Sequence, residues 1–195
     1  MREGKQKNKY RVVLFDDQPE RLSRQNTMLD EAGCDIVVSV VNESNLLPAV
    51  KKNNPEVILI CSEKPRKSMI KVLANLQASF PKPIVMFSLD DESETIKQAA
   101  AAGVSSYLVG DIQVDRIGSI IDVAIIRFEH SQQLKLKLKK VESQLSERKI
   151  LDKAKGLLMA QHNITEEEAY GMMRKLAMDN SCKISQIAQD IILVK

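Results

Sequence analysis

The stretch ERKILDKAKGLLMAQ, residues 147–161, sets the organisation of this chain of 195 residues. Its apolar side chains recur at the spacing of an amphipathic helix, at Ile150, Ala154, Leu157 and Leu158. Basic side chains lie largely on its other faces, at Arg148, Lys149, Lys153 and Lys155. One side of this helix can therefore pack while another meets a polyanion.

Positive charge is concentrated in one block around that stretch. The formal net charge is only +3, but residues 127–162 hold nine Lys or Arg against four Asp or Glu. Residues 1–126 hold sixteen bases against seventeen acids, and residues 163–195 hold four against five. A phosphate backbone would complement such a surplus, and a solvated helix face explains it equally well.

The cysteine pattern and the hydropathy place the chain in a reducing, aqueous compartment. Cys34, Cys61 and Cys182 are odd in number and form no CxxC pair, so neither a disulfide framework nor a zinc site is indicated. The N-terminus is charged, and no apolar run approaches the roughly 20 residues of a membrane span. We expect a soluble, cytoplasmic protein.

Five short apolar runs alternate with helix-length segments between Tyr10 and Arg116. Continuous β-branched runs bounded by turn residues are typical of buried parallel strands joined by right-handed helical crossovers. Gly33 and Gly103 stand where two helices should end in a left-handed residue. The predicted fold is an α/β doubly wound five-stranded parallel sheet, with strands at 11–15, 35–41, 56–61, 83–88 and 105–110.

The first predicted strand ends in Asp16 and Asp17, at the edge of the sheet where such folds bind ligands. Paired carboxylates at this edge can hold Mg²⁺. Alternatively, one aspartate caps the helix that begins near Pro19. Mg²⁺ at this pair is a weak candidate metal site, and no cofactor is otherwise predicted.

The segments VVLFDDQPE (12–20) and SSYLV (105–109), together with Ser88 after the fourth strand and five βα units, resemble a response regulator receiver domain. The resemblance implies an acidic pocket formed by Asp16, Asp17 and Ser88. It also implies a phosphoacceptor aspartate at the end of the third strand and a lysine at the end of the fifth.

Two positions depart from that pattern. The acceptor position holds Cys61, and the lysine position holds Gly110. Without the carboxylate there is no aspartyl phosphate, so we predict a pseudo-receiver that keeps the fold but not the phosphorylation switch. Cys61 could instead be a redox sensor, although inert packing is the favoured interpretation of a cysteine at a strand end.

A long helix is predicted beyond Gln113, because only Gly118 interrupts the run before Gly156. Its first part should cover the sheet through Ile117, Ile120, Ala124, Ile125 and Phe128. Its second part carries apolar residues at spacings of four, three and four, the seam of a dimeric coiled coil: Leu134, Leu138, Val141 and Leu145. Alternatively, a single helix stacks on its own domain. The predicted domains are 1–116, a helical linker 117–146, and 147–195.

The last part of the chain predicts an all-α three-helix bundle. Its second helix should open with a capping box formed by Thr165 and Glu168. The stripe of that helix comprises Ala169, Met172, Met173, Leu176 and Ala177. The third helix, from about Cys182, carries Ile184, Ile187, Ala188, Ile191 and Ile192.

Three segments in this order, 147–159, 166–180 and 183–192, resemble the ANTAR domain of the AmiR and NasT transcription antiterminators. The resemblance covers nearly the whole chain, since those proteins have the same order of receiver, helical linker and ANTAR module, and the NasT type is the better match. The residues that carry the resemblance are Ala154, Lys155, Gly156, Met159, Glu168, Ala169, Arg174, Ala177 and Ala188.

The resemblance implies binding to paired hairpins in nascent leader RNA, which prevents a terminator from forming. A homodimer would present two modules to two hairpins. For the NasT type it further implies a nitrate- or nitrite-sensing protein that sequesters the antiterminator, and control of nitrate and nitrite assimilation genes. Tyr170 could stack on a loop base, although a place in the core is favoured. The predicted RNA-binding residues are Arg148, Lys149, Lys153, Lys155, Tyr170, Arg174 and Lys175.

The sequence gives less support to two other classes of function, a DNA-binding response regulator and an enzyme. A DNA-binding response regulator would need a recognition helix rich in polar residues, whereas the last helix, residues 183–195, is mostly apolar. No nucleophile elbow, Walker loop or metal-ligand cluster is present, so no enzyme is expected.

Overall fold

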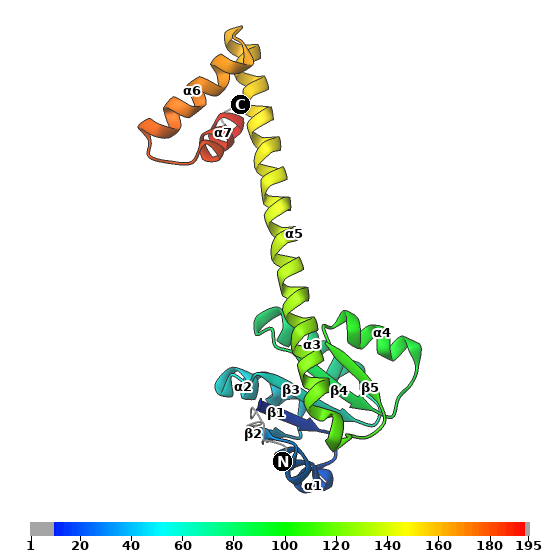
Figure 1. The fold of residues 1–195 in the computed structure, drawn as a ribbon. Coiled ribbons are helices and arrows are strands. Elements are labelled where there is room, and N and C mark those ends of the chain that lie inside the picture. The colour runs from blue at the N-terminus through cyan, green and yellow to red at the C-terminus, as the bar shows by residue number, and fades with distance from the viewer. Residues whose placement is uncertain (1–9, 194–195) are drawn as a thin grey trace, which may run out of the picture. The chain divides into compact units, whose positions relative to one another are not determined.

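The first part of the chain folds around a parallel β-sheet (Figure 1). The computed structural model describes residues 10–193. Its five strands lie in the order β2-β1-β3-β4-β5 and all pair in parallel. The predicted doubly wound sheet is therefore confirmed. The strands are β1 (Tyr10–Asp16), β2 (Cys34–Val40), β3 (Val57–Ser62), β4 (Ile84–Ser88) and β5 (Ser106–Val109).

Apolar residues on both faces of the central strands explain why they read as continuous apolar runs. In β1, Val13 and Phe15 belong to the core on one face, whereas Val12 and Leu14 belong to the core on the other. All four side chains are at most 1% exposed. Alternating side chains point to opposite faces of a strand, so a strand covered on both sides must be apolar throughout.

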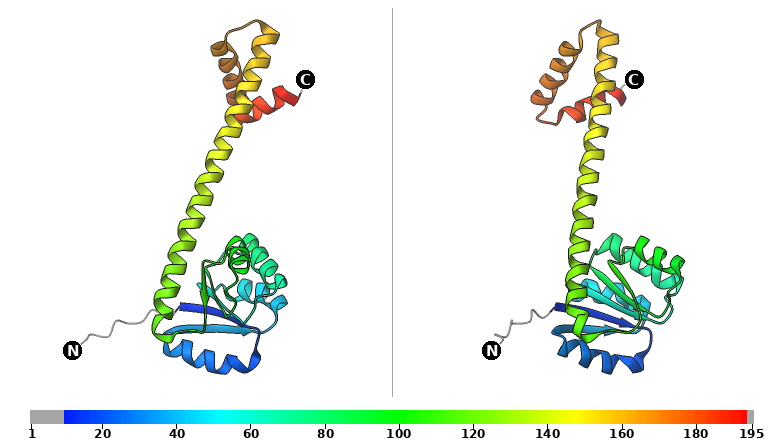
Figure 2. Two further views of the ribbon diagram at one scale, coloured as in Figure 1. Left: turned by 90° about the vertical axis from the view of Figure 1, so that its right-hand side faces the viewer. Right: turned by 45° about the vertical axis from the view of Figure 1, so that its right-hand side comes forward.

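Helices cover both faces of the sheet (Figure 2). On one face pack α2 (Glu43–Asn53), α3 (Lys67–Ser79) and α4 (Ser93–Ala101), and on the other pack α1 (Pro19–Glu31) and the first part of α5 (Val114–His162). Two glycines end α1 and α4 with left-handed backbone, as predicted: Gly33 has φ 84° and Gly103 has φ 93°.

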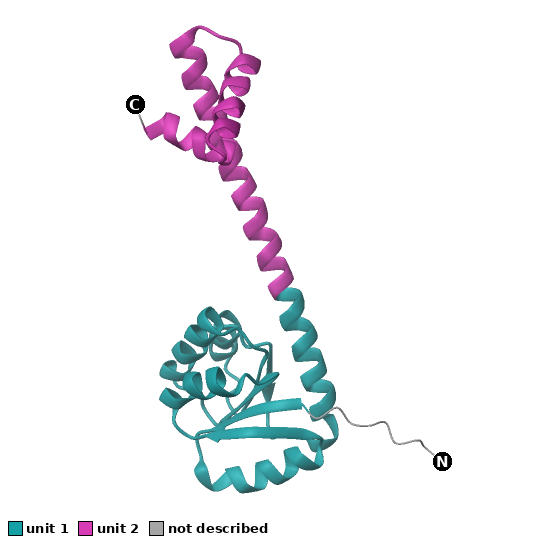
Figure 3. Cartoon of the chain, turned by 90° about the vertical axis from the view of Figure 1, so that its left-hand side faces the viewer, with its two compact units in different colours: residues 1–131 teal, residues 132–195 magenta. Residues whose placement is uncertain are grey.

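Helix α5 is 49 residues long and contributes to both compact units of the chain. The boundary between the units falls between Ser131 and Gln132 (Figure 3). The predicted boundary at residue 116 is thus too early, because Ile117, Ile121 and Ala124 are fully buried against the sheet. No helix within residues 10–193 is both long and apolar enough to cross a bilayer.

The second unit is a three-helix bundle made by the end of α5 with α6 (Glu166–Asp179) and α7 (Ile184–Leu193). Thr165 and Glu168 form the predicted capping box. The predicted stripe of α6 is too wide, since Met172 and Leu176 are 41% and 43% exposed. The buried core of the bundle consists of Ala154, Leu158, Ala169, Met173, Ala177, Ile187 and Ala188.

Candidate functional site

The acidic pair lies at the carboxyl edge of the sheet, as predicted. Asp16 is the last residue of β1 and pairs in register with Cys61 of β3. Asp16 is fully buried, Ser88 at the end of β4 is 3% exposed, and Cys61 is 4% exposed. These positions follow directly from the parallel sheet, because its carboxyl ends meet at one edge.

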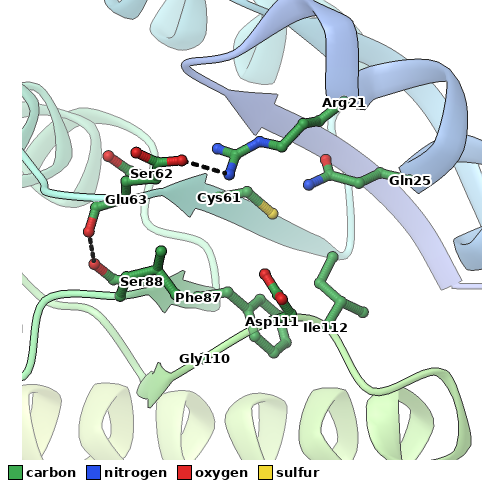
Figure 4. A pocket seen from close by; sticks show the side chains of 11 residues that line it. Arg21, Gln25, Cys61, Ser62, Glu63, Phe87, Ser88, Gly110, Asp111 and Ile112 are labelled. Carbon is green, nitrogen blue, oxygen red and sulfur yellow. Dashed lines mark hydrogen bonds and ion pairs between the residues drawn. The ribbon is translucent and has the colours of Figure 1, made fainter.

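A cation that the sequence did not reveal occupies this acidic edge. Arg21, on the first turn of α1, reaches back over the end of the sheet (Figure 4). Its Nη2 lies 2.8 Å from Asp16 Oδ1 and 3.1 Å from Asp17 Oδ1, and its Nη1 lies 3.4 Å from Glu63 Oε1. Three carboxylates from two neighbouring strand ends therefore share one guanidinium, which we call the Arg21 cluster: Arg21, Asp16, Asp17 and Glu63.

The remaining oxygens of the two aspartates are partly used within the protein. Asp16 Oδ1 accepts a hydrogen bond from the backbone amide of Gln18 at 2.8 Å, and Asp17 Oδ2 accepts one from the Ser62 hydroxyl at 2.5 Å. Gln18, the residue just before α1, makes no side-chain cap. Asp16 thus holds the backbone just before the helix, which is close to the capping role considered for it but not a standard cap.

The pocket between Arg21 and Cys61 is small. It has a volume of about 20 Å³ and is lined by Arg21, Cys61, Ser88 and Gly110 among others. That volume suits about one water molecule.

Burial, and then the nearby carboxylate of Asp16, raise the pKa of the Cys61 thiol to about 12. The thiol is therefore protonated near neutral pH, which disfavours the redox-sensor interpretation.

Gly110 occupies the predicted lysine position with a backbone that lysine would rarely adopt. Its φ is +111°, and the space around an added Cβ is open to 4 Å. The position thus lacks both the ammonium group and the usual conformation of a residue that carries a side chain.

Ser88 joins the acidic edge to the next loop. Its hydroxyl donates to the backbone carbonyl of Glu63 at 3.0 Å and accepts from the backbone amide of Asp90 at 3.1 Å. The amide of Leu89 also donates to the Glu63 carbonyl, at 3.2 Å. Glu63 therefore contacts Arg21 through its side chain and the end of β4 through its backbone carbonyl.

The acidic edge does not fit a divalent metal ion in this structure. Mg²⁺ would require the carboxylate oxygens of Asp16 and Asp17, and Arg21 already contacts one oxygen of each. Within residues 10–193, no group of three or more His, Cys, Asp or Glu side chains could hold a metal. The weak Mg²⁺ candidate is therefore not supported.

The predicted RNA-binding cations of the second unit are mostly exposed. The side chain of Arg148 is 82% exposed, and four others are also exposed: Lys149, Lys153, Arg174 and Lys175. Lys149 and Lys153 line an open hollow of about 460 Å³ beside Ile192 and Leu193 of α7. Among the described residues, only Arg148 of these five has an ion pair, a long one of 3.9 Å from its Nε to Asp152 Oδ2, so the cations are accessible to a ligand.

Lys155 differs from the other cations. Its side chain is only 17% exposed, and its Nζ lies 2.5 Å from Glu166 Oε1 and 2.9 Å from Asp152 Oδ1. The hydrogen bond to Glu166, followed by that to Asp152, raises the pKa of Lys155. This ammonium ties α5 to the start of α6, so its predicted contact with RNA competes with two carboxylates of its own chain.

Tyr170 does not belong to the core of the bundle. It is 45% exposed, whereas its neighbour Ala169 is fully buried. The favoured core interpretation was wrong because Tyr170 lies beside the narrow stripe formed by Ala169, Met173 and Ala177. Arg174 follows it by one helical turn, so the two side chains are neighbours on one face of α6.

Comparison with known proteins agrees with both units. The sequence model of the response regulator receiver domain matches residues 12–122, more than half of the chain. The chain belongs to this family. The model of the ANTAR domain matches residues 139–192, so the second unit carries an ANTAR domain. Both resemblances inferred from the sequence are confirmed.

Known proteins are similar to this chain over most of its length or over one part of it. The transcriptional regulatory protein PdtaR of Mycobacterium tuberculosis is 25% identical over 184 residues, which cover 93% of this chain and 89% of the relative. The nitrate regulatory protein of Klebsiella oxytoca is 39% identical over 64 residues, 33% of this chain and 16% of the relative. The signal receiver domain of NarL from Mycobacterium tuberculosis has a TM-score of 0.52 at 24% identity, covering 60% of this chain and 97% of that one, and supports the receiver fold alone.

Proposed function

We propose that this protein is an RNA-binding transcription antiterminator whose ANTAR domain binds hairpins in nascent leader RNA. The ANTAR match over residues 139–192 carries this proposal, because it covers the cationic end of α5 together with α6 and most of α7. RNA loops with unstacked bases are bound by cations that meet phosphates and by side chains that stack on or hydrogen-bond to the bases.

Exposed side chains of the bundle supply both kinds of contact. Arg148, Lys149, Lys153, Arg174 and Lys175 provide positive charge at the surface. Tyr170 provides an exposed aromatic ring next to Arg174, suited to stacking on a loop base. Lys155 is assigned to holding α5 against α6, since two carboxylates already engage it.

The receiver domain acts as a pseudo-receiver in this proposal. The acceptor position holds a protonated, buried thiol at Cys61, and Gly110 replaces the lysine. Incubation with a small phosphodonor and Mg²⁺, followed by mass measurement, tests this assignment. A stable single phosphate on a carboxylate would contradict it.

Dimerisation through α5 would present two ANTAR domains to paired hairpins. Four apolar residues of the predicted seam are 53–60% exposed, namely Leu134, Leu138, Val141 and Leu145. Isolated apolar side chains are common on surfaces, but a regular seam along a helix favours a second copy as its partner.

The regulatory setting follows from the NasT-type resemblance and from the nitrate regulatory relative. We propose that the protein works in the cytoplasm and controls nitrate and nitrite assimilation genes. A nitrate- or nitrite-sensing protein would sequester it until its ligand arrives. The same resemblance makes the protein a regulator without enzymatic activity.

Gel-shift titrations with the leader RNA of its own operon test the central proposal. The intact protein should shift the leader RNA at moderate salt and should leave promoter DNA of the same operon unshifted. Binding to promoter DNA with no binding to leader RNA would instead favour the DNA-binding response regulator. A leader with one hairpin deleted should bind more weakly, because one ANTAR domain of a dimer then lacks its partner.

A further inference from the structure

The Arg21 cluster places one guanidinium among three carboxylates at the acidic edge of the receiver domain. Arg21 Nη2 and Nε contact Asp16 Oδ1 at 2.8 Å and 3.3 Å, and Nη2 also contacts Asp17 Oδ1 at 3.1 Å. Glu63 adds a longer contact of 3.4 Å to Nη1. A planar guanidinium with five donors suits several oxygens at once, unlike an ammonium.

The burial of Asp16 requires a cation at this position. Its side chain is fully buried, whereas that of Arg21 is 28% exposed. A buried carboxylate without a partner is strongly unfavourable, so removing Arg21 would leave a buried charge that a bound cation could compensate. Asp16 Oδ2 has no hydrogen-bond partner within residues 10–193, and it stays available as a further acceptor.

We propose that Arg21 is a built-in cation that takes the place of a divalent metal ion at Asp16 and Asp17, so that the receiver domain is insensitive to Mg²⁺. This inference deepens the proposed pseudo-receiver, since it assigns the missing metal's role to a residue of the chain. Arg21 contacts one oxygen of each of the two carboxylates that a metal would need, Asp16 Oδ1 and Asp17 Oδ1. A guanidinium and a divalent ion repel each other, so they exclude one another at this edge.

The built-in cation also fixes the loop after β3. The side chain of Glu63 pairs with Arg21, while its backbone carbonyl accepts hydrogen bonds from the Ser88 hydroxyl and from the Leu89 amide. Arg21 thereby connects α1 to the loop after β3 and, through it, to the end of β4.

Thermal unfolding of the full-length protein with MgCl₂, against NaCl of equal ionic strength, tests the proposal. The parent protein should show no shift in Tm beyond the NaCl control. Arg21→Ala should have a lower Tm in NaCl and should regain stability as MgCl₂ rises, because a ligand that binds only the folded state stabilises it by mass action. Arg24→Ala, which removes an exposed arginine from the same helix, should behave like the parent.

Further variants assign the Mg²⁺ response to Asp16 and provide a substitute if Arg21→Ala does not fold. Asp16→Asn in the Arg21→Ala background should abolish the Mg²⁺ response. If Arg21→Ala cannot be purified, Arg21→Met retains most of the side-chain volume without the charge. A Mg²⁺ response of the parent equal to that of the variant overturns the proposal, and so does a variant that ignores Mg²⁺. The Mg²⁺-dependent shift in Tm reports on cation binding, so it is independent of the phosphorylation test, which reports on phosphate transfer to a carboxylate.

Discussion

Replacing Arg174 by alanine should weaken RNA binding, whereas replacing Lys155 should weaken the fold of the ANTAR domain instead. Arg174 is exposed, and no ion pair involving it is present in residues 10–193. Lys155 is 17% exposed and contacts two carboxylates. The sequence places both residues on the proposed RNA surface, so the two variants separate surface contact from internal support.

The expected size for Arg174→Ala follows from counterion release. One phosphate contact contributes about 0.7 to the slope of log K against log salt for single-stranded nucleic acid. At about 0.1 M salt, the loss of one contact should therefore lower the affinity about fivefold, with a slope smaller by about 0.7. Lys155→Ala should leave the slope unchanged, and it should lower the Tm of the ANTAR domain because the tie from α5 to Glu166 is lost.

Fluorescence anisotropy with labelled leader RNA at several salt concentrations gives the slopes, and calorimetry gives the Tm. Lys97→Ala, at an exposed position of α4 in the receiver domain, removes the same charge as a control and should change neither quantity. A reduced slope for Lys155→Ala at unchanged Tm, or an Arg174→Ala variant that binds like the parent, would refute the reasoning.

Three further results are expected. Leu138→Asp should convert a dimer into a monomer in analytical ultracentrifugation, because it places a charge in the proposed seam; a monomeric parent contradicts the dimer. Iodoacetamide at mildly alkaline pH should label the half-buried Cys182 well before Cys61, whose pKa is about 12; mass mapping that finds Cys61 labelled first would be inconsistent with this burial. The hydrogen bond to Asp122 raises the pKa of Tyr10 from 10.0 to about 12, so its stabilising contribution is complete below pH 10.0 and is lost towards pH 12. The difference in free energy of unfolding between the parent and Tyr10→Phe should disappear over that range, and a difference that persists above it would contradict the assignment.

Local patterns predicted the receiver sheet well. The central strands β1, β3 and β4 are largely apolar runs, because they are buried on both faces of the sheet. The positions of Cys61 and Gly110 also followed from the sequence, since each lies at the end of such a run. The capping box at Thr165 was equally visible, because its partner Glu168 is three residues away.

Side-chain contacts between different helices and strands could not be predicted from the sequence. Arg21 is only five residues from Asp16, yet its third partner, Glu63, follows a different strand and becomes a neighbour only when β1 and β3 pair. The tie between Lys155 and Glu166 spans the turn that joins α5 to α6. Periodicity showed an apolar stripe on α6 but not its width, which depends on how much of the helix its two neighbours cover.

The Arg21 cluster opposes single substitutions that would build the phosphoacceptor site of the receiver family. Introducing an aspartate at position 61 would place a fourth acid beside one guanidinium, and it would pair in register with the buried Asp16. A lysine at position 110 would meet a backbone suited to glycine, with φ +111°. Loss of Arg21 alone would leave the buried carboxylate of Asp16 without its cationic partner. Each of these changes is unfavourable while the other two are absent, so we expect a working phosphoacceptor site to require all three together.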